Sequence, residues 1–267
     1  MEEDLFEVSG TICLAGVFFG IVFYACQWGP FRRLSLQLFE SNSKLSKEDL
    51  DDIAVRMANR VMGTLHNIIQ VPFAFLVMRD PKVSGDRMYG ATQTSRLFCC
   101  ITAGYFLVDL FICMGQHHEG PLFFVHAAFA FTLYAHGSFT GFMHFYGAAF
   151  IMWEISTFFV HMRWVLLKMG KENSKMYIIN GVSMIVAFFG VRVLFGNYMS
   201  FMVWGDTMGE LKRPSPNGTS PTIIWIYLAA NICLSLLNTY WFSLMIRKAV
   251  GLLFAKKQGT PSHQKQQ

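Results

Sequence analysis

Charged residues are scarce in this chain. They make up 15% of its 267 residues, against about 25% in an ordinary soluble domain. Hydrophobic residues make up 53%, and 27 residues are phenylalanine, which excludes a soluble globular protein. The composition predicts a multi-pass helical membrane protein that forms one domain. The net charge of +5 does not indicate nucleic-acid binding, because the basic residues fall between the apolar runs.

Motifs for disulfides and metals are also missing. The six cysteines lie in or at the edge of apolar runs, and none shows CxxC spacing, so we expect thiols embedded in the membrane. The adjacent pair His117 and His118 has no third histidine three or four residues away. The HxxxH and HxxHH boxes of membrane di-iron hydroxylases and desaturases are therefore absent, and we expect no metal site.

The chain lacks a basic start and an internal repeat. Its first residues, MEEDLFEVSG, are acidic, whereas a secretory signal starts with basic residues. We therefore predict that the first apolar run is a retained membrane span. Because we find no inverted repeat, the hypothesis of a transporter or cargo receptor has no specific support.

Seven apolar runs are long enough to cross a bilayer at about 20 residues per span. The predicted spans are residues 9–27, 60–78 and 97–114, two helices between 121 and about 163, and then 176–203 and 222–246. We place the turn between the fourth and fifth helices at His136–Gly141. Ser46 to Asp49 match a capping box, which predicts an amphipathic helix on the cytosolic face that runs into the second span. An ordinary solvated helix is the alternative.

The basic residues predict the orientation. Most lysines and arginines fall in the segments that are cytosolic if the N-terminus is lumenal and the C-terminus is cytosolic, as the positive-inside rule requires. Asn217, Gly218 and Thr219 form an acceptor pattern for glycosylation, and this orientation places them in the lumen.

Polar side chains fall inside the predicted spans, where a charged group costs about 2.5–3.5 kcal/mol. A rise of 1.5 Å per residue places most of them in the cytosolic half, so we expect a polar pocket inside the bundle. Its candidate residues are His66, Asn67, Asp109, His126, Trp153, Glu154, His161, Asn180 and Arg192. Glu154 is the nearest plausible counter-ion of Arg192. The alternative is structural: an ion pair or helix–helix hydrogen bond for Asp109 and Glu154, and a hydrogen-bonded core histidine for His126.

Five segments resemble the TLC-domain family, which includes the ceramide synthases. They are NRVMGTLHNII, GYFLVDLF, FFVHAAFAF, WEISTFFVHMRW and FFGVRVLFG, and the chain looks closest to the small branch of the family without extra domains. The resemblance implies a barrel-like bundle of six helices around a long cavity, one preceding helix, and a location in the endoplasmic reticulum. We therefore divide the chain into an N-terminal helix and cytosolic connector (1–54), a TLC domain (55–250) and a disordered cytosolic tail (251–267).

The resemblance also suggests two functions. In ceramide synthases, an adjacent histidine pair with nearby aspartates serves acyl transfer from acyl-CoA to a sphingoid base. Here only His126 matches, since Ala127 follows it and WEISTFF replaces the aspartate-rich motif. The first hypothesis is a protein of sphingolipid or phospholipid homeostasis that binds a lipid or fatty acyl chain in the pocket and does not turn it over.

The second hypothesis is an acyl-CoA-dependent N- or O-acyltransferase, with acyl-CoA as co-substrate and no other cofactor. His126 would be the catalytic base or nucleophile, and Asp109 or Glu154 would raise its basicity and select its tautomer. Whether the protein is an enzyme, and its oligomeric state, stay open at this point.

Overall fold

The computed structural model describes residues 2–40, 42, 46–115, 120–216 and 218–257. These residues are helical, with no β-strand among them, and seven helices are long and apolar enough to cross a membrane. The predicted all-helical membrane fold with seven spans is therefore confirmed. Asn217, His117 and His118 lie outside the described residues.

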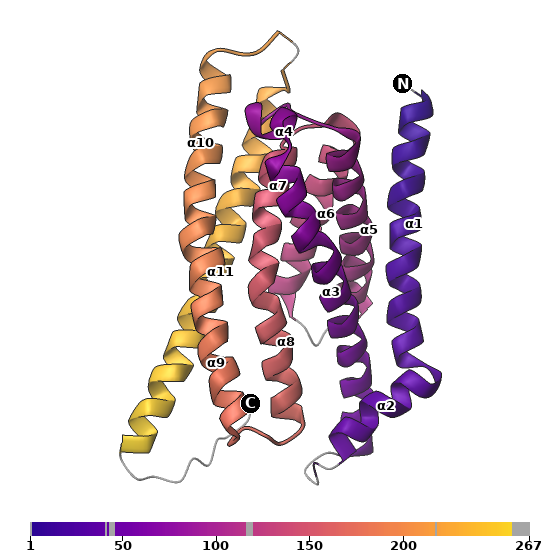
Figure 1. Ribbon diagram of the computed structural model, residues 1–267, viewed down its shortest axis with the longest axis vertical. Coiled ribbons are helices and arrows are strands. Elements are labelled where there is room, and N and C mark those ends of the chain that lie inside the picture. The colour runs from indigo at the N-terminus through magenta and orange to yellow at the C-terminus, as the bar shows by residue number, and fades with distance from the viewer. Residues whose placement is uncertain (1, 41, 43–45, 116–119, 217, 258–267) are drawn as a thin grey trace.

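The helices follow one another with short connections (Figure 1). Their bounds are α1 Glu2–Gln27, α2 Gly29–Glu40, α3 Lys47–Arg79, α4 Pro81–Gly85, α5 Gln93–Gly115, α6 Pro121–Thr140, α7 His144–Ile151, η1 Met152–Glu154, α8 Ile155–Lys168, α9 Lys175–Phe188, η2 Phe189–Phe195, α10 Gly196–Lys212 and α11 Pro221–Lys257. The fifth span consists of α7, η1 and α8, and the sixth consists of α9, η2 and α10.

The bundle has two distinct ends (Figure 1). We call them the N-terminal end, where α1 begins and α10 is joined to α11, and the C-terminal end, where α2 lies and α8 is joined to α9. Helices α3, α5, α6, α8, α9 and α11 contribute to one central cavity, whereas α1 packs outside against α5. The predicted arrangement of six helices around a cavity, with one preceding helix, is therefore what the structure shows.

The capping box predicted at Ser46 is present. The Ser46 hydroxyl accepts a hydrogen bond from the Asp49 amide at 3.2 Å, and the Asp49 carboxylate accepts one from the Ser46 amide at 2.8 Å. These two bonds satisfy amide groups that an uncapped helix would leave without partners. From this start α3 continues without a break to Arg79, so the predicted helix does run into the second span. Helix α2, in the segment predicted only as a polar connector, was missed.

Three predicted boundaries differ from the structure. Helix α6 continues through His136 to Thr140, and the turn follows at Gly141, which has a left-handed φ of 77°. Helix α10 continues past the predicted end at 203 to Lys212, and α11 continues to Lys257, so the start of the predicted tail is helical. The predictions ended each span where hydrophobicity ended, but a helix need not end where the hydrocarbon does.

Glycine permits a close contact between α1 and α5. A Cβ atom on Gly104 would lie 2.6 Å from Cβ of Ala15 and 2.7 Å from the amide nitrogen of Gly16. No side chain fits at that distance, so the two backbones approach each other as in other small-residue crossings of membrane helices. The contact holds α1 against the outside of the bundle and leaves the central cavity to the other spans.

Candidate functional site

A polar cavity of about 340 Å³ lies in the half of the bundle nearer the C-terminal end. Five of the predicted pocket residues line it, and they come from α5, α6, η1, α8 and η2: Asp109, His126, Glu154, His161 and Arg192. Arg60 of α3 lines the same cavity. Side chains that are far apart in the sequence therefore face one space, including Arg192, which the rise per residue had placed in the other half of the membrane.

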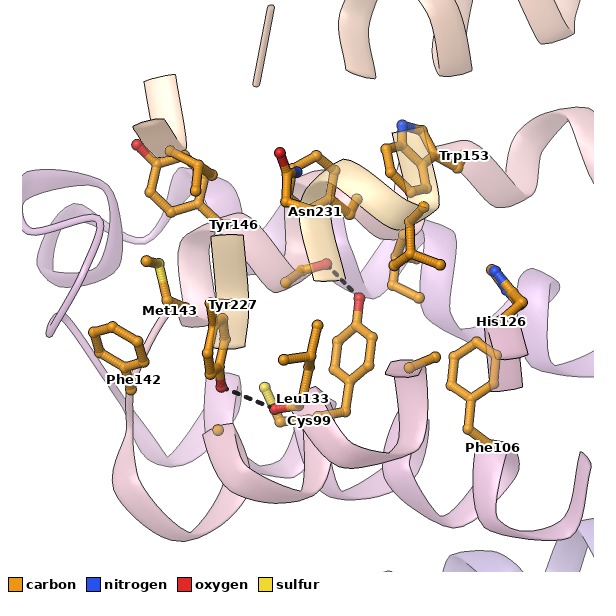
Figure 2. Close-up of a pocket in the computed structure, with 18 of the residues that line it drawn as sticks. Cys99, Phe106, His126, Leu133, Phe142, Met143, Tyr146, Trp153, Tyr227 and Asn231 are labelled. Atoms are coloured by element: carbon orange, nitrogen blue, oxygen red, sulfur yellow. Dashed lines mark hydrogen bonds between the residues drawn. The ribbon is translucent and has the colours of Figure 1, made fainter. Parts of the chain in front are cut away.

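A second cavity of about 90 Å³ continues from the first toward the N-terminal end. Phe106, His126 and Glu154 line both cavities. The rest of its wall is mostly apolar or aromatic and includes Ala130, Leu133, Tyr134, Tyr146 and Tyr227. Figure 2 shows His126 and Phe106 at one end of this pocket and Phe142 and Met143 at the other. The two cavities thus adjoin at these shared residues, and the first has more polar side chains in its wall than the second.

Arg192 is the most strongly bound side chain of the site. It lies in η2, a π-helical stretch, and is 7% exposed. Its guanidinium donates hydrogen bonds at 2.8–3.4 Å to the Trp153 carbonyl, the Ser156 hydroxyl, the Thr157 hydroxyl, the Glu154 carboxylate and the Asn238 side-chain oxygen. A buried charge needs such a set of partners. The wider turn of a π-helix is a common feature of functional sites.

The predicted pairing of Arg192 with Glu154 is confirmed by a distance of 3.4 Å between the guanidinium and the carboxylate. The contact is long for a charge-assisted hydrogen bond. It involves Glu154 Oε1. Because Glu154 lines both cavities, its carboxylate lies at their junction.

His126 lies at the same junction. Its ring meets Phe106 edge-on, with centroids 5.8 Å apart, and meets Trp241 at 6.1 Å. Among the described residues, neither ring nitrogen has a hydrogen-bond partner. The structural alternative of a hydrogen-bonded core histidine therefore does not describe His126, whose imidazole faces the cavity.

His161 and Arg60 line the polar cavity on the side toward the C-terminal end of the bundle, which we take as its entrance. The Nδ1 atom of His161 is 2.9 Å from the Thr64 hydroxyl on α3. Nearby, the Arg60 guanidinium stacks over the ring of Trp164 at 4.0 Å. Both contacts join α3 to α8, so these residues shape the entrance as well as lining it.

Three other predicted residues line neither cavity. His66 is fully buried and stacks on the ring of Tyr105 at 3.9 Å, with Nδ1 3.2 Å from the side-chain oxygen of Asn67. Asn67 donates to the Glu154 carbonyl at 3.5 Å. Asn180 donates to the Phe159 carbonyl at 2.9 Å and joins α9 to α8. These side chains lie behind the residues that line the pocket and support them. The sequence could not distinguish such a supporting residue from a lining residue.

Trp153 lines the apolar cavity and not the polar one. Its indole Nε1 is buried and has no hydrogen-bond partner in the part of the chain that the structure describes. A Cβ atom on Gly196 would lie 2.5 Å from that nitrogen, so the glycine makes room for the indole ring. Trp153 therefore contributes apolar surface together with a buried donor.

The sequence analysis missed the tyrosines of the apolar cavity. The Tyr134 hydroxyl donates to the Gly147 carbonyl at 2.6 Å, and the Tyr227 hydroxyl donates to the Leu133 carbonyl at 3.1 Å (Figure 2). Both hydroxyls are satisfied by backbone, so the rings present mainly apolar surface to the cavity. A tyrosine in the middle of an apolar run was the available signal, because its hydroxyl needs a partner when buried.

Comparison with known proteins agrees with this architecture. The TLC-domain family model matches residues 56–247. The chain is 26% identical to an uncharacterised TLC domain-containing protein of Schizosaccharomyces pombe over 85% of this chain and 76% of that protein. It is 25% identical to TLC domain-containing protein 4-B of Danio rerio over 97% and 96% of the two chains. It is also 24% identical to topoisomerase I damage affected protein 4 of Saccharomyces cerevisiae, over 97% and 91%. Because the family model matches most of its length, and the matched residues form this helical bundle, the chain belongs to the TLC-domain family of membrane proteins.

Proposed function

We propose that this protein binds a membrane lipid or fatty acyl chain in the joined cavities and serves lipid homeostasis, of sphingolipids or phospholipids, without turning the lipid over. The observation that carries the proposal is the junction at His126 and Glu154, where a polar cavity meets an apolar one. A pocket divided in this way matches the two parts of a lipid, a polar head and an apolar chain.

The head of the lipid would lie in the polar cavity. Its candidate partners there are Asp109, the two nitrogens of His126 and the Glu154 carboxylate. Arg192 already donates to five protein acceptors, so its part is to hold Glu154 in place. These groups offer both donors and acceptors, which suits a head with hydroxyl, amino or amide groups.

The chain of the lipid would lie between α6 and α11 in the apolar cavity, against Ala130, Leu133 and Tyr227. Burial of apolar surface contributes about 25 cal/mol per Å², so several buried methylene groups supply the main part of the affinity. The small volume of this cavity, about 90 Å³, favours the end of one chain over two chains side by side.

The same residues allow a second function, acyl transfer. His126 lies where the head and the chain of a bound lipid would join, which is where an ester or amide bond is made. In that reaction the imidazole would take the proton of an acceptor amine or hydroxyl, the acceptor would attack the thioester carbonyl of acyl-CoA, and the thiol would leave. Binding alone is the better supported function, because no described carboxylate bonds to His126 and orients it.

The proposed setting follows the orientation predicted from the basic residues. The C-terminal end of the bundle, where the polar cavity lies, would face the cytosol, and the N-terminus would face the lumen of the endoplasmic reticulum. A glycosidase-sensitive mass that disappears in Asn217→Gln would support this orientation. Modification of the C-terminal tail from the lumenal side would contradict it.

Mass spectrometry of lipids that copurify with the protein tests the proposal. Ala130→Phe fills the apolar cavity and is expected to remove most of the bound lipid, whereas Ala229→Phe, on the exposed side of α11, is expected to keep it. The proposal fails if the wild type carries no lipid, or if both variants carry as much as the wild type.

The acyltransferase alternative needs a separate assay. Purified protein would be incubated with labelled acyl-CoA and either a long-chain amine or a lysolipid. A product that forms with the wild type and is lost with His126→Ala would establish catalysis. Absence of product across the acceptors, together with retained lipid, would leave binding as the function.

A further inference from the structure

Helix α2 has no role in the proposed lipid pocket, yet its surface is unusual. It begins at Gly29, whose left-handed φ of 68° turns the chain away from the axis of α1. Figure 1 shows α2 running across the C-terminal end of the bundle toward α3. At 12 residues it is too short to cross a bilayer, which takes about 20.

The surface of α2 is divided into three faces. Phe31, Leu34 and Leu38 recur at helical spacing, and their side chains are 61%, 61% and 40% exposed. Arg33 and Gln37 are exposed and, being four residues apart, share a second face. The third face packs on the bundle, because Phe39 is fully buried there and Arg32 bonds to Asp51 of α3.

The apolar face continues the lipid-facing surface of α1. Ile21 and Tyr24, in the last turns of that span, are each 63% exposed, and Trp28 between the two helices is 73% exposed. Tryptophan and tyrosine are typical of the level where hydrocarbon meets the lipid head groups. A helix with one apolar and one polar face at this level lies in the plane of the membrane.

We propose that α2 is an in-plane helix inserted into the leaflet at the C-terminal end of the bundle. Phe31, Leu34 and Leu38 would lie among the acyl chains, and Arg33 and Gln37 would lie among head groups and water. The partner is thus the lipid surface itself, and continuity with the exposed side of α1 favours it over a second copy of the chain.

The contacts of α2 extend to the entrance of the polar cavity. Phe39 meets the ring of Trp164 edge-on, with centroids 6.0 Å apart. Trp164 in turn lies under Arg60, which lines the polar cavity. An inserted α2 would therefore hold that entrance at the level of the lipid head groups. The inference that α2 is inserted depends only on the three faces of the helix. Its consequence for the entrance also depends on the proposed lipid binding.

Spin labels on the full-length protein in nanodiscs test the insertion. Leu34→Cys places a label on the apolar face and Gln37→Cys places one on the polar face of the same helix, after Cys13, Cys26, Cys113 and Cys233 are replaced by alanine. We expect the label at 34 to be relaxed mainly by oxygen and the label at 37 mainly by a water-soluble nickel complex. Equal access of the nickel complex to both labels would overturn the insertion. Protection of position 34 from both reagents, together with spin–spin broadening between copies, would assign the face to a second chain and also overturn it.

A second variant tests the link to the cavity entrance. Leu34→Glu is expected to raise hydrogen exchange severalfold in α2 and in the last turns of α8, while Gln37→Glu leaves both unchanged. Unchanged exchange in both variants would contradict an inserted α2. Faster exchange in α2 alone, with α8 and lipid binding unaffected, would keep the insertion and remove its role at the entrance.

Discussion

The two ends of this bundle are held together by different kinds of contact. At the N-terminal end, Arg87 donates two hydrogen bonds of 2.8 Å to the Asp206 carboxylate, which also accepts a bond from the Tyr146 hydroxyl. Tyr89 donates to Glu210 at 2.9 Å and accepts from the amide of Thr219 at 3.1 Å. These bonds join the loop before α5 to α7, α10 and the segment that leads into α11.

The C-terminal end is held mostly by stacking and single hydrogen bonds, beside the ion pair of Arg32 with Asp51. Arg60 stacks over Trp164 at 4.0 Å and Arg163 stacks over Tyr177 at 4.2 Å. The side chain of Asn42 donates to the Lys168 carbonyl at 2.9 Å. Cation–π contacts contribute about 0.5–1 kcal/mol at exposed sites, and paired hydrogen bonds to a carboxylate contribute more.

The firmer contacts adjoin the apolar cavity, since Tyr146 both lines it and donates to Asp206. The apolar cavity ends against Phe142, Met143 and Tyr146, which belong to a buried apolar cluster at the N-terminal end. The bonds to Asp206, and then those to Tyr146, raise the pKa of the Arg87 guanidinium, so the ion pair persists at neutral pH. If the proposed lipid site is correct, we expect it to be filled and emptied through the polar cavity.

We expect the largest loss of unfolding free energy from Arg192→Met, at the junction between the two cavities. The variant leaves Glu154 buried without its cation, and breaking a buried pair costs about 3–5 kcal/mol of unfolding free energy. Denaturant titration in mixed micelles measures the loss. The double variant Arg192→Met with Glu154→Gln is expected to recover part of it, because no unpaired charge remains. Equal losses in the single and double variants would show that the pair itself contributes little.

We expect a smaller loss of unfolding free energy from Asp206→Asn, which weakens the contacts at the N-terminal end. Arg87 and Tyr146 lose a charged acceptor, and since Arg87 is partly exposed we expect a loss of about 2 kcal/mol. The more specific result is faster modification of the Cys99 thiol, which lines the apolar cavity and is free, by a charged methanethiosulfonate reagent added on the N-terminal side of sealed vesicles.

Cys113, which lines the polar cavity, is the internal control for that experiment. Its rate of modification from the opposite side is expected to be the same in the wild type and in Asp206→Asn. Ready modification of Cys99 from the N-terminal side in the wild type would mean that the cavity is already open at both ends.

We expect the smallest loss of stability from Arg60→Ala, near the C-terminal end of the bundle. Loss of its stacking on Trp164 is expected to lower the unfolding free energy by about 0.5–1 kcal/mol, and lipid exchange is expected to become faster because Arg60 lines the entrance. Arg163→Ala removes a similar stacking contact on Tyr177 away from the cavity and is expected to change stability alone. Equal rates of lipid exchange in the two variants would show that Arg60 does not control the entrance.

The positions of the polar side chains could be predicted only in part. The rise per residue along each predicted span placed Asp109, His126 and, deeper in the membrane, Glu154 in the cytosolic half, and the structure places all three on one cavity. Depth does not give rotation about the helix axis, however. His66 and Asn180 have suitable depths but turn to neighbouring helices, because the packing of the whole bundle decides which face of each helix points inward.

By itself, the sequence determined the number of spans, the capped start of α3 and the pairing of Arg192 with Glu154, because hydrophobicity, capping and the cost of a buried charge act over short distances or leave few choices. The tertiary structure alone decided that the pocket has a polar and an apolar part, and that a carboxylate on α10 closes one end of the bundle. These features depend on helix rotation and on contacts between residues more than a hundred positions apart, such as Arg87 and Asp206, which no local pattern specifies.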